Sequence, residues 1–245
     1  MNNAWILVLG ANSDMALATA GRFARAGYNL YLASRNQVEL EKNAADLTLR
    51  FGVQARALPF DGRDFVTHQH FYATLAEKPQ GVILAFGTMH DQGLAQKDFE
   101  LAREMVETNY LGAISILEIV AADLAARKSG FIVGVSSVAG DRGRQSNYLY
   151  GSSKAGLSAY LGGLRHRLHK FGVSVLTVKP GFIATKMTAH LDLPPKLTAQ
   201  PEDVAEAIFK GVEKKKNIIY VKPIWRLIML IIVHLPEYVF KKTNL

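Results

Sequence analysis

Short apolar runs alternate with amphipathic segments along most of the chain, which is 245 residues long. Apolar runs without polar alternation are typical of strands that are buried on both faces of a parallel sheet. The rhythm of strands and helices predicts an α/β fold, a Rossmann-like, doubly wound parallel sheet of about seven strands in a single domain. The expected strands are residues 5–9, 29–33, 53–58, 82–86, 131–136, 173–178 and 218–221.

The first unit of this pattern suits the binding of a nucleotide. A turn of small residues begins at Gly10, and an amphipathic segment follows it and ends at Gly27, before the second strand. Strand, turn, helix and strand form a βαβ unit. Free backbone N–H groups at the start of its helix would face a pyrophosphate.

Tyr150 and Lys154 lie four residues apart, and Ser137 precedes Tyr150 by thirteen residues. On a helix, positions i and i+4 share one face, so the phenol and the ammonium would point into the same site. A nearby cation lowers the pKa of a phenol and makes it a better proton donor near neutral pH. The Ser137 hydroxyl could hold a substrate oxygen beside that phenol. Taken alone, the spacing fits a buried Tyr and a solvated Lys on an ordinary helix equally well.

Together with the turn, this set resembles the short-chain dehydrogenase/reductase family over residues 5–221. That family uses a TGxxxGxG turn, a helix Asn and a Ser–Tyr–Lys set. Gly10 matches the first glycine, whereas Asp14 and Ala16 stand at the second and third glycine positions. We interpret Asp14 as a cap of the helix N-terminus, where a carboxylate is favourable.

The resemblance implies four catalytic residues. Tyr150 would protonate the forming alkoxide, and Ser137 would hold that oxygen. Lys154 would lower the pKa of Tyr150 and bind the nicotinamide ribose, and Asn109 would position a relay water.

Two neighbours compete for these roles. Ser136 adjoins Ser137, but the spacing to Tyr150 selects Ser137. Tyr148 has no lysine four residues further on.

The resemblance also implies a cofactor site at the carboxyl ends of the strands. Asp61 matches the acid that contacts the adenine, and Thr185 matches the threonine that meets the nicotinamide carboxamide. Ala85 replaces the family's Asn. The implied cofactor-binding residues are Gly10, Asn12, Ser13, Asp14, Met15, Ser34, Arg35, Asp61, Gly87, Tyr150, Lys154, Pro180, Gly181, Ile183 and Thr185.

The end of the second strand indicates which cofactor is used. A carboxylate there would accept hydrogen bonds from a ribose 2′-hydroxyl and repel a 2′-phosphate. This chain has Ser34 and Arg35 instead, and the guanidinium can pair with a phosphate. NADPH (NADP) is therefore favoured over NADH (NAD), unless Arg35 is merely solvated and selects nothing.

Composition excludes several other classes of protein. The net charge is +8, from 29 basic and 21 acidic residues, but no nucleic-acid-binding motif accompanies it. The chain has no cysteine, which excludes disulfides and thiolate metal sites and fits a reducing compartment. We interpret His68, His70, His166 and His169 as surface residues and expect no metal site. Only residues 1–4 precede the first strand, so we expect no secretory signal and a cytoplasmic protein.

An apolar segment near the C-terminus stands apart from this pattern. Its uninterrupted run, residues 227–233, is far shorter than the roughly 20 residues that span a bilayer. Trp225, Tyr238 and the flanking lysines are residue types favoured at a lipid interface. We expect a partly exposed amphipathic helix over 224–240, in peripheral contact with the inner face of the membrane. Packing against the core or a partner subunit is the alternative.

The division is therefore an NADP-binding domain with the catalytic site at residues 1–221 and an amphipathic extension at 222–245, which the core should not need. The extension and the loop of residues 136–148 resemble the decaprenylphosphoryl-2-keto-ribose 2-reductases. These enzymes reduce a keto sugar on a polyprenyl phosphate. Arg142 and Arg144 could then pair with the phosphodiester of the substrate, or could hold the loop through backbone hydrogen bonds.

The resulting hypothesis is an NADPH-dependent ketone reductase that acts on a small-molecule or lipid-linked ketone and forms a homo-oligomer, a dimer or a tetramer. Residues 186–199 would form a substrate lid. A reductase of 3-oxoacyl or 3-ketosphinganine type is the alternative enzyme. A non-catalytic nucleotide-binding scaffold is the alternative from another class of protein.

Overall fold

The computed structural model describes residues 3–188 and 192–243. Seven parallel strands form one sheet in the order β3-β2-β1-β4-β5-β6-β9, which confirms the predicted fold class. Two-residue strands β7 and β8 form a second, small parallel sheet that the hydrophobic pattern did not predict. The strands are β1 (Trp5–Leu9), β2 (Asn29–Ser34), β3 (Ala55–Pro59), β4 (Gly81–Leu84), β5 (Phe131–Val135), β6 (Ser174–Pro180), β7 (Phe182–Ile183), β8 (Thr198–Ala199) and β9 (Ile218–Val221).

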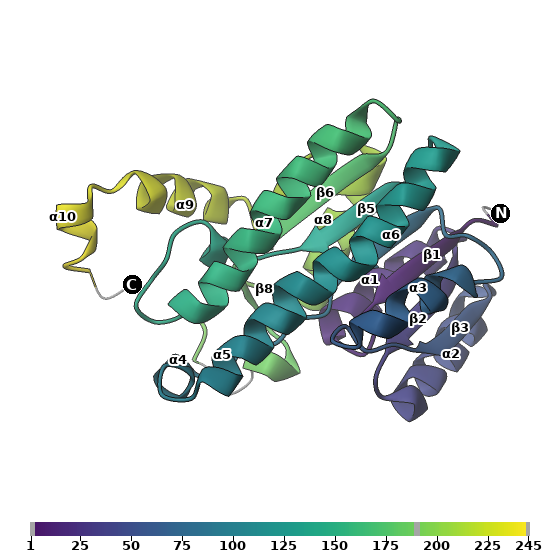
Figure 1. Ribbon diagram of the computed structural model, residues 1–245, viewed down its shortest axis with the longest axis horizontal. Helices are drawn as coiled ribbons and strands as arrows, with labels where there is room; N and C mark the ends of the chain where they lie inside the picture. Colours follow the sequence, from purple (N-terminus) through teal and green to yellow (C-terminus); the bar gives the residue numbers. More distant parts are fainter. Residues whose placement is uncertain (1–2, 189–191, 244–245) are drawn as a thin grey trace.

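Helices cover both faces of the sheet. Helices α1, α2 and α8 bury their apolar residues against one face, and α3, α6 and α7 against the other. Figure 1 shows α6 and α7 running side by side in front of the sheet. The helices are α1 (Asp14–Arg25), α2 (Gln37–Phe51), α3 (His68–Ala73), α4 (Gln92–Ala95), α5 (Phe99–Val106), α6 (Gly112–Arg127), α7 (Tyr148–His169), α8 (Pro201–Glu213), α9 (Ile224–His234) and α10 (Glu237–Phe240).

Burial on both faces explains why the strands read as continuous apolar runs. In β1, Ile6 and Val8 pack into the core under α1, α2 and α8, whereas Leu7 and Leu9 pack into the core under α3, α6 and α7. Successive side chains of a strand point to opposite faces, so both sets must be apolar.

One helical stretch in the described part of the chain, residues 99–127, is long and apolar enough to cross a membrane by length and composition. It consists of α5, a π-helical turn at 107–111 and α6. Ile116, Leu117 and Val120 of α6 are fully buried in the core. Packing within the domain therefore accounts for the apolar character of this stretch.

The C-terminal extension forms two helices that extend away from the sheet (Figure 1). The expected single helix is divided because Pro236 follows α9 and begins the short α10. One face of α9 is buried: Trp225, Met229 and Ile232 form a third apolar cluster with Val138. Placing Trp225 at a lipid interface was therefore wrong, because its indole is 5% exposed and packs on the domain.

Interpreting His68 as a surface residue was also wrong. Its side chain is fully buried, with Nδ1 2.8 Å from the hydroxyl of Ser115 and Nε2 3.0 Å from the carbonyl oxygen of Asp61. Its ring stacks on Phe60. His68 therefore supports the loop that follows β3, because a buried imidazole needs hydrogen-bond partners for its polar atoms.

Candidate active site

The four predicted catalytic residues come from three segments beside the carboxyl ends of the central strands. Ser137 follows β5, Tyr150 and Lys154 lie in the first two turns of α7, and Asn109 lies in the π-helical turn between α5 and α6. In open α/β sheets, ligands bind in the crevice outside these strand ends. The topology thus brings together residues that are far apart in the sequence.

The structure distinguishes the two adjacent serines. Ser136 is buried, and its hydroxyl donates to the carbonyl oxygen of Lys154 at 2.9 Å and lies 2.7 Å from the hydroxyl of Ser158. It therefore anchors α7 to β5. Ser137 is only half-buried, and its side chain is close enough to Tyr150 to lower the pKa of the phenol. Ser137 is thus the serine that can act together with Tyr150.

The two candidate tyrosines also differ in their surroundings. Tyr148 is 43% exposed, and its hydroxyl donates to Gln96 Oε1 at 3.3 Å. Tyr150 instead adjoins Ser137, and its ring centroid lies 5.8 Å from Lys154 Nζ.

Lys154 is a buried cation at the centre of the site. Its Nζ donates to the carbonyl oxygen of Val135 at 3.1 Å, and burial lowers its pKa to about 8. A Cβ on Gly87 would lie 3.2 Å from this nitrogen and 2.9 Å from Asn109 Oδ1. Glycine at position 87 therefore keeps the space beside the ammonium open.

The pKa of Tyr150 moves in the direction opposite to the prediction. Burial raises the pKa to about 12, and the Ser137 side chain opposes that rise. Desolvation disfavours the phenolate, and it is the larger effect on this group. Tyr150 therefore holds its proton throughout the physiological pH range.

Asn109 joins the end of β4 to α7. Its side-chain amide exchanges two hydrogen bonds of 2.8 Å with the backbone of Thr88 and donates to Ser153 at 3.0 Å. The side chain thus holds the backbone after Gly87 beside Lys154. The role of Asn109 in positioning a relay water stays a prediction.

The glycine-poor turn still has the geometry of a nucleotide loop. Gly10 has φ +85°, and a Cβ there would meet the backbone nitrogen of Phe86 at 2.6 Å. Both the positive φ and the close approach require glycine. Ser13 caps α1 by accepting a hydrogen bond from the backbone N–H of Ala16 at 3.2 Å.

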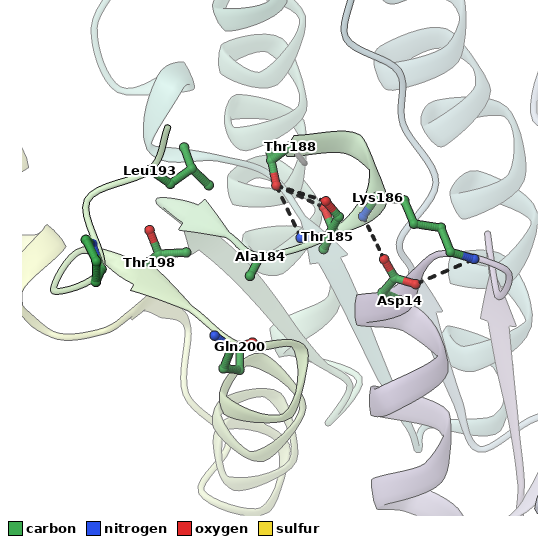
Figure 2. A pocket seen from close by; sticks show the side chains of 9 residues that line it. Asp14, Ala184, Thr185, Lys186, Thr188, Leu193, Thr198 and Gln200 are labelled. Carbon is green, nitrogen blue, oxygen red and sulfur yellow. Dashed lines mark hydrogen bonds and ion pairs between the residues drawn. The ribbon is translucent and has the colours of Figure 1, made fainter. Parts of the chain in front are cut away.

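Interpreting Asp14 as the helix cap was therefore wrong. Asp14 lies in the first turn of α1, and its Oδ2 accepts a hydrogen bond of 2.9 Å from the backbone N–H of Lys186. Figure 2 shows the carboxylate turned toward the segment that contains Thr185, Lys186 and Thr188, with Lys186 Nζ 4.0 Å from its other oxygen. This contact directs the negative charge away from the free N–H groups of the turn.

A cavity of about 620 Å³ lies beside this contact (Figure 2). It is lined by Asp14, Ala184, Thr185, Lys186, Thr188, Leu193, Pro195, Thr198 and Gln200. Residues 192–199 of the predicted lid thus border the cavity in part, whereas residues 189–191 lie outside the described residues.

The residues that are predicted to bind the adenosine part of the cofactor lie around the carboxyl end of β2. The Asn12 amide donates to the carbonyl oxygen of Asn36 at 2.9 Å and so ties the turn to the β2–α2 loop. Ser34 ends β2, and Arg35 is exposed directly after it. Asp61 is half-buried, and its carboxylate accepts a hydrogen bond from the backbone N–H of Arg63 at 2.9 Å.

Pro180 ends β6, and Gly181, which follows it, packs against the C-terminal extension. A Cβ on Gly181 would lie 1.9 Å from Cε2 of Trp225, whose Nε1–H donates to the carbonyl oxygen of Leu197 at 2.9 Å. Helix α9 therefore packs against the loop that is predicted to meet the nicotinamide and that contains Ile183 and Thr185. Sequence reasoning missed this role of Trp225, because it interpreted the segment as an appendage.

The two loop arginines have different surroundings. Arg142 Nη1 donates to the carbonyl oxygens of Ile232 and Leu235 at 2.6 Å each, and Nη2 pairs with Glu237 at 2.8 Å. Arg142 therefore satisfies free carbonyls at the end of α9, which fits the alternative that this arginine holds the loop through backbone hydrogen bonds. Arg144 is half-buried, and burial lowers its pKa.

A buried ion pair with strand β6 also holds the loop that contains Arg142 and Arg144. The carboxylate of Asp141 pairs with Lys179 of β6 and accepts a hydrogen bond of 2.8 Å from the Tyr220 hydroxyl of β9. Burial, followed by this hydrogen bond, raises the pKa of Tyr220. The partners are 38 and 79 residues from Asp141 in sequence, so no local motif indicated the network.

These features fit a nicotinamide cofactor. The turn at Gly10 exposes the capped N-terminus of α1, Gly87 leaves room beside the Lys154 ammonium, and Arg35 is exposed at the end of β2. Each part of a dinucleotide thus has a complementary group of protein atoms.

Comparison with known proteins agrees with this geometry. The model of the short chain dehydrogenase family matches residues 4–195. The chain belongs to this family. Two relatives of similar length are described as uncharacterized oxidoreductases. One, from Mycobacterium tuberculosis, is 34% identical over 97% of this chain and 96% of its own length. The other, from Streptomyces coelicolor, is 36% identical over 97% and 94%.

Solved structures show the same fold. A short-chain dehydrogenase from Sphingobium yanoikuyae in complex with NADPH superposes with a TM-score of 0.82 at 24% identity, over 93% of this chain and 92% of that one. An actinorhodin polyketide ketoreductase with NADPH gives a TM-score of 0.80 at 22% identity, over 90% and 96%. The chain is an NAD(P)-dependent oxidoreductase of the short-chain dehydrogenase family.

Proposed function

We propose that this protein is an NADPH-dependent reductase of ketones. The observation that carries the proposal is the cluster of Ser137, Tyr150 and Lys154 beside Gly87, with the ammonium buried 5.8 Å from the centroid of the Tyr150 ring. A protonated phenol next to a buried cation suits the delivery of a proton to an oxygen that is gaining negative charge.

The roles of the residues follow from their positions. NADPH, when bound, supplies the hydride that reduces the carbonyl carbon. Tyr150 gives its proton to the carbonyl oxygen, and the Ser137 hydroxyl holds that oxygen in place. The phenolate that remains is stabilised by the Lys154 ammonium. Asn109 keeps the Thr88 backbone and α7 in register, so that these groups stay aligned.

Arg35 supports the choice of NADPH. No carboxylate follows Ser34, and an exposed guanidinium at the end of β2 can make a charge-assisted, bidentate contact with a 2′-phosphate. An enzyme that selects NADH would place an acid at this position.

The substrate we propose is a keto sugar carried on a polyprenyl phosphate. Arg144, in the loop between Ser137 and Tyr150, supplies the cation for the phosphodiester. This substrate requires both a polar site beside the catalytic residues and an apolar surface for the lipid. A reductase of acyl ketones would require only the apolar surface.

The outer face of α9 and α10, here called the C-terminal apolar face, supports the lipid part of this proposal. Leu230 is 58% and Ile231 57% exposed, although the opposite face of α9 is buried. Arg226, Lys241 and Lys242 flank this surface. The exposed apolar members are Ile224, Leu227, Leu230, Ile231, Val233, Tyr238 and Val239. We propose that it contacts an anionic membrane surface peripherally.

A substrate panel tests the reaction. NADPH oxidation is followed with a keto sugar linked to a polyprenyl phosphate, a 3-oxoacyl thioester and a simple ketone. The proposal expects the lipid-linked sugar to have the highest kcat/KM. Preference for the 3-oxoacyl thioester would support the alternative enzyme, a reductase of 3-oxoacyl type. If no ketone causes oxidation of NADPH, the remaining alternative is a non-catalytic nucleotide-binding scaffold.

Co-sedimentation with anionic liposomes tests the C-terminal apolar face. A Leu227→Ser, Leu230→Ser double variant should bind liposomes more weakly, and salt should weaken binding of the unaltered chain because the cations act through a screened field. Leu49→Ser, at an 86% exposed position on α2, is the matched control. If the double variant instead converts an oligomer to a monomer and the unaltered chain ignores liposomes, this face is a subunit contact.

A further inference from the structure

Helix α7, which carries Tyr150, has an unusual N-terminus. Asn147 occupies the N-cap position, but its side chain makes no capping hydrogen bond. The backbone N–H of Leu149 donates instead to Gln92 Oε1 of α4, at 3.1 Å. A distant glutamine thus does the work of the cap residue, and the Asn147 amide is released from it.

Three buried side-chain polar atoms near this end of α7 have no hydrogen-bond partner in the described ranges. They are the donors Gln92 Nε2 and Arg144 Nε and the acceptor Asn147 Oδ1. The backbone links two of these residues, because the N–H of Asn147 donates to the carbonyl oxygen of Arg144 at 3.1 Å. Gln92 Oε1 reaches Leu149, two residues after Asn147. All three residues therefore belong to the segments that border the Tyr150 end of α7.

Buried polar atoms in folded proteins almost always have partners, and an unpaired one costs free energy. A cluster of such atoms beside a catalytic residue is therefore explained best by a ligand that pairs with them. Two donors and one acceptor match a ligand with oxygen acceptors and a hydroxyl donor. An acyl chain would leave all three unpaired.

We propose that Gln92, Arg144 and Asn147 form a pocket for the non-reacting oxygens of a polyhydroxylated, anionic ketone. This inference rests on the proposed reductase function and adds a specificity site to it. Arg144 would bind an anionic oxygen, Gln92 Nε2 would donate to a hydroxyl, and Asn147 Oδ1 would accept from one. The pocket selects a sugar over an acyl ketone because only the sugar pairs with the buried atoms.

The test compares two ketone probes, ribulose 5-phosphate and 2-octanone, with NADPH as reductant. The quantity measured is the ratio of their kcat/KM values, which reports specificity and is insensitive to a general loss of Tyr150 alignment. Asn147→Ala removes the free acceptor and should lower the ratio about tenfold or more. Gln92→Glu keeps the oxygen that accepts from Leu149 but loses the free donor, so it should lower the ratio while α7 stays capped.

Thermal unfolding separates binding from structure. In the ligand-free protein Asn147→Ala breaks no side-chain hydrogen bond, so its melting temperature should not fall, whereas Gln92→Met loses the cap of α7 and should melt lower. Ribulose 5-phosphate should raise the melting temperature of the unaltered chain with NADPH but not that of Asn147→Ala. Gln96→Met, at the other end of α4, is the control and should leave the ratio unchanged.

Two results would overturn the pocket. Equal losses with both ketones would mean that these residues only position Tyr150, and an unchanged ratio in Asn147→Ala and Gln92→Glu would mean that water satisfies the buried atoms. If the unaltered chain reduces neither ketone, the reductase function itself fails. The melting-temperature shift with ribulose 5-phosphate then still decides whether the pocket exists.

Discussion

The substitution Trp225→Ala tests whether α9 is part of the domain or an appendage. The indole is 5% exposed, lies over Gly181 and meets the Phe182 ring edge-on, with the ring centroids 5.4 Å apart. Truncating a buried Trp costs about 3–5 kcal/mol of unfolding free energy. Loss of the Nε1–H donor would also leave the carbonyl oxygen of Leu197 without this partner, at a further cost of about 1 kcal/mol.

We therefore expect Trp225→Ala to lower the free energy of unfolding by about 4–6 kcal/mol, which is a large share of the roughly 5–15 kcal/mol typical of a domain. Trp225→Phe keeps most of the ring but loses the hydrogen bond, and should cost about 1–2 kcal/mol. Affinity for NADPH should also fall in Trp225→Ala, because Gly181 lies in the loop predicted to meet the nicotinamide. Urea denaturation followed by circular dichroism measures the first effect, and titration calorimetry measures the second.

Leu227→Ser provides the matched control on the same helix. Leu227 is 55% exposed, so its replacement should change the unfolding free energy by no more than about 0.5 kcal/mol. The reasoning is refuted if Trp225→Ala costs less than about 1 kcal/mol and is indistinguishable from Leu227→Ser. The extension would then be undocked in solution, as the sequence alone suggested.

Three further predictions concern the site itself. Tyr150→Phe should lower turnover about 100-fold or more by removing the proton donor, whereas Tyr148→Phe should be mild; the reverse pattern in steady-state kinetics would contradict the assignment. Arg35→Ala should weaken NADPH binding by about 1.5–3 kcal/mol and leave NADH nearly untouched, and calorimetry that finds a preference for NADH in the unaltered chain would refute it. Burial lowers the pKa of Lys154 to about 8, so between pH 8 and its ordinary value near 10.5 the unfolded chain binds more protons than the folded one. The unfolding free energy of the unaltered chain should therefore rise with pH across that range, relative to that of Lys154→Met. If urea denaturation gives the same difference between the two proteins at pH 7.5 and at pH 9.5, the result argues against a buried ammonium.

Much of the site was readable from the sequence, because its signals are short and regular. The interval from Tyr150 to Lys154 is about one helical turn, and Ser137 follows a strand whose apolar run is unmistakable. Gly10 and Gly87 mark places where backbone or cation comes too close for a side chain. Such local patterns can be recognised without any knowledge of the fold.

Arg142, Asp14 and Gln92 were not readable in this way. Arg142 contacts Ile232, 90 residues further on, and Asp14 contacts Lys186, 172 residues further on. Gln92 caps a helix that begins 56 residues later, as the difference between positions 148 and 92 shows. In sequence each is an ordinary polar residue, and its role depends on which atoms the fold places opposite it.

The sequence by itself determined the parallel sheet and the alternation of its strands and helices, because the hydrophobic period is a property of adjacent positions. Only the tertiary structure decided that Trp225 is a core residue and that burial raises the pKa of Tyr150. Burial and desolvation arise from atoms supplied by distant segments. The sequence of an apolar run such as residues 224–235 does not indicate which face of the helix other segments of the chain will cover.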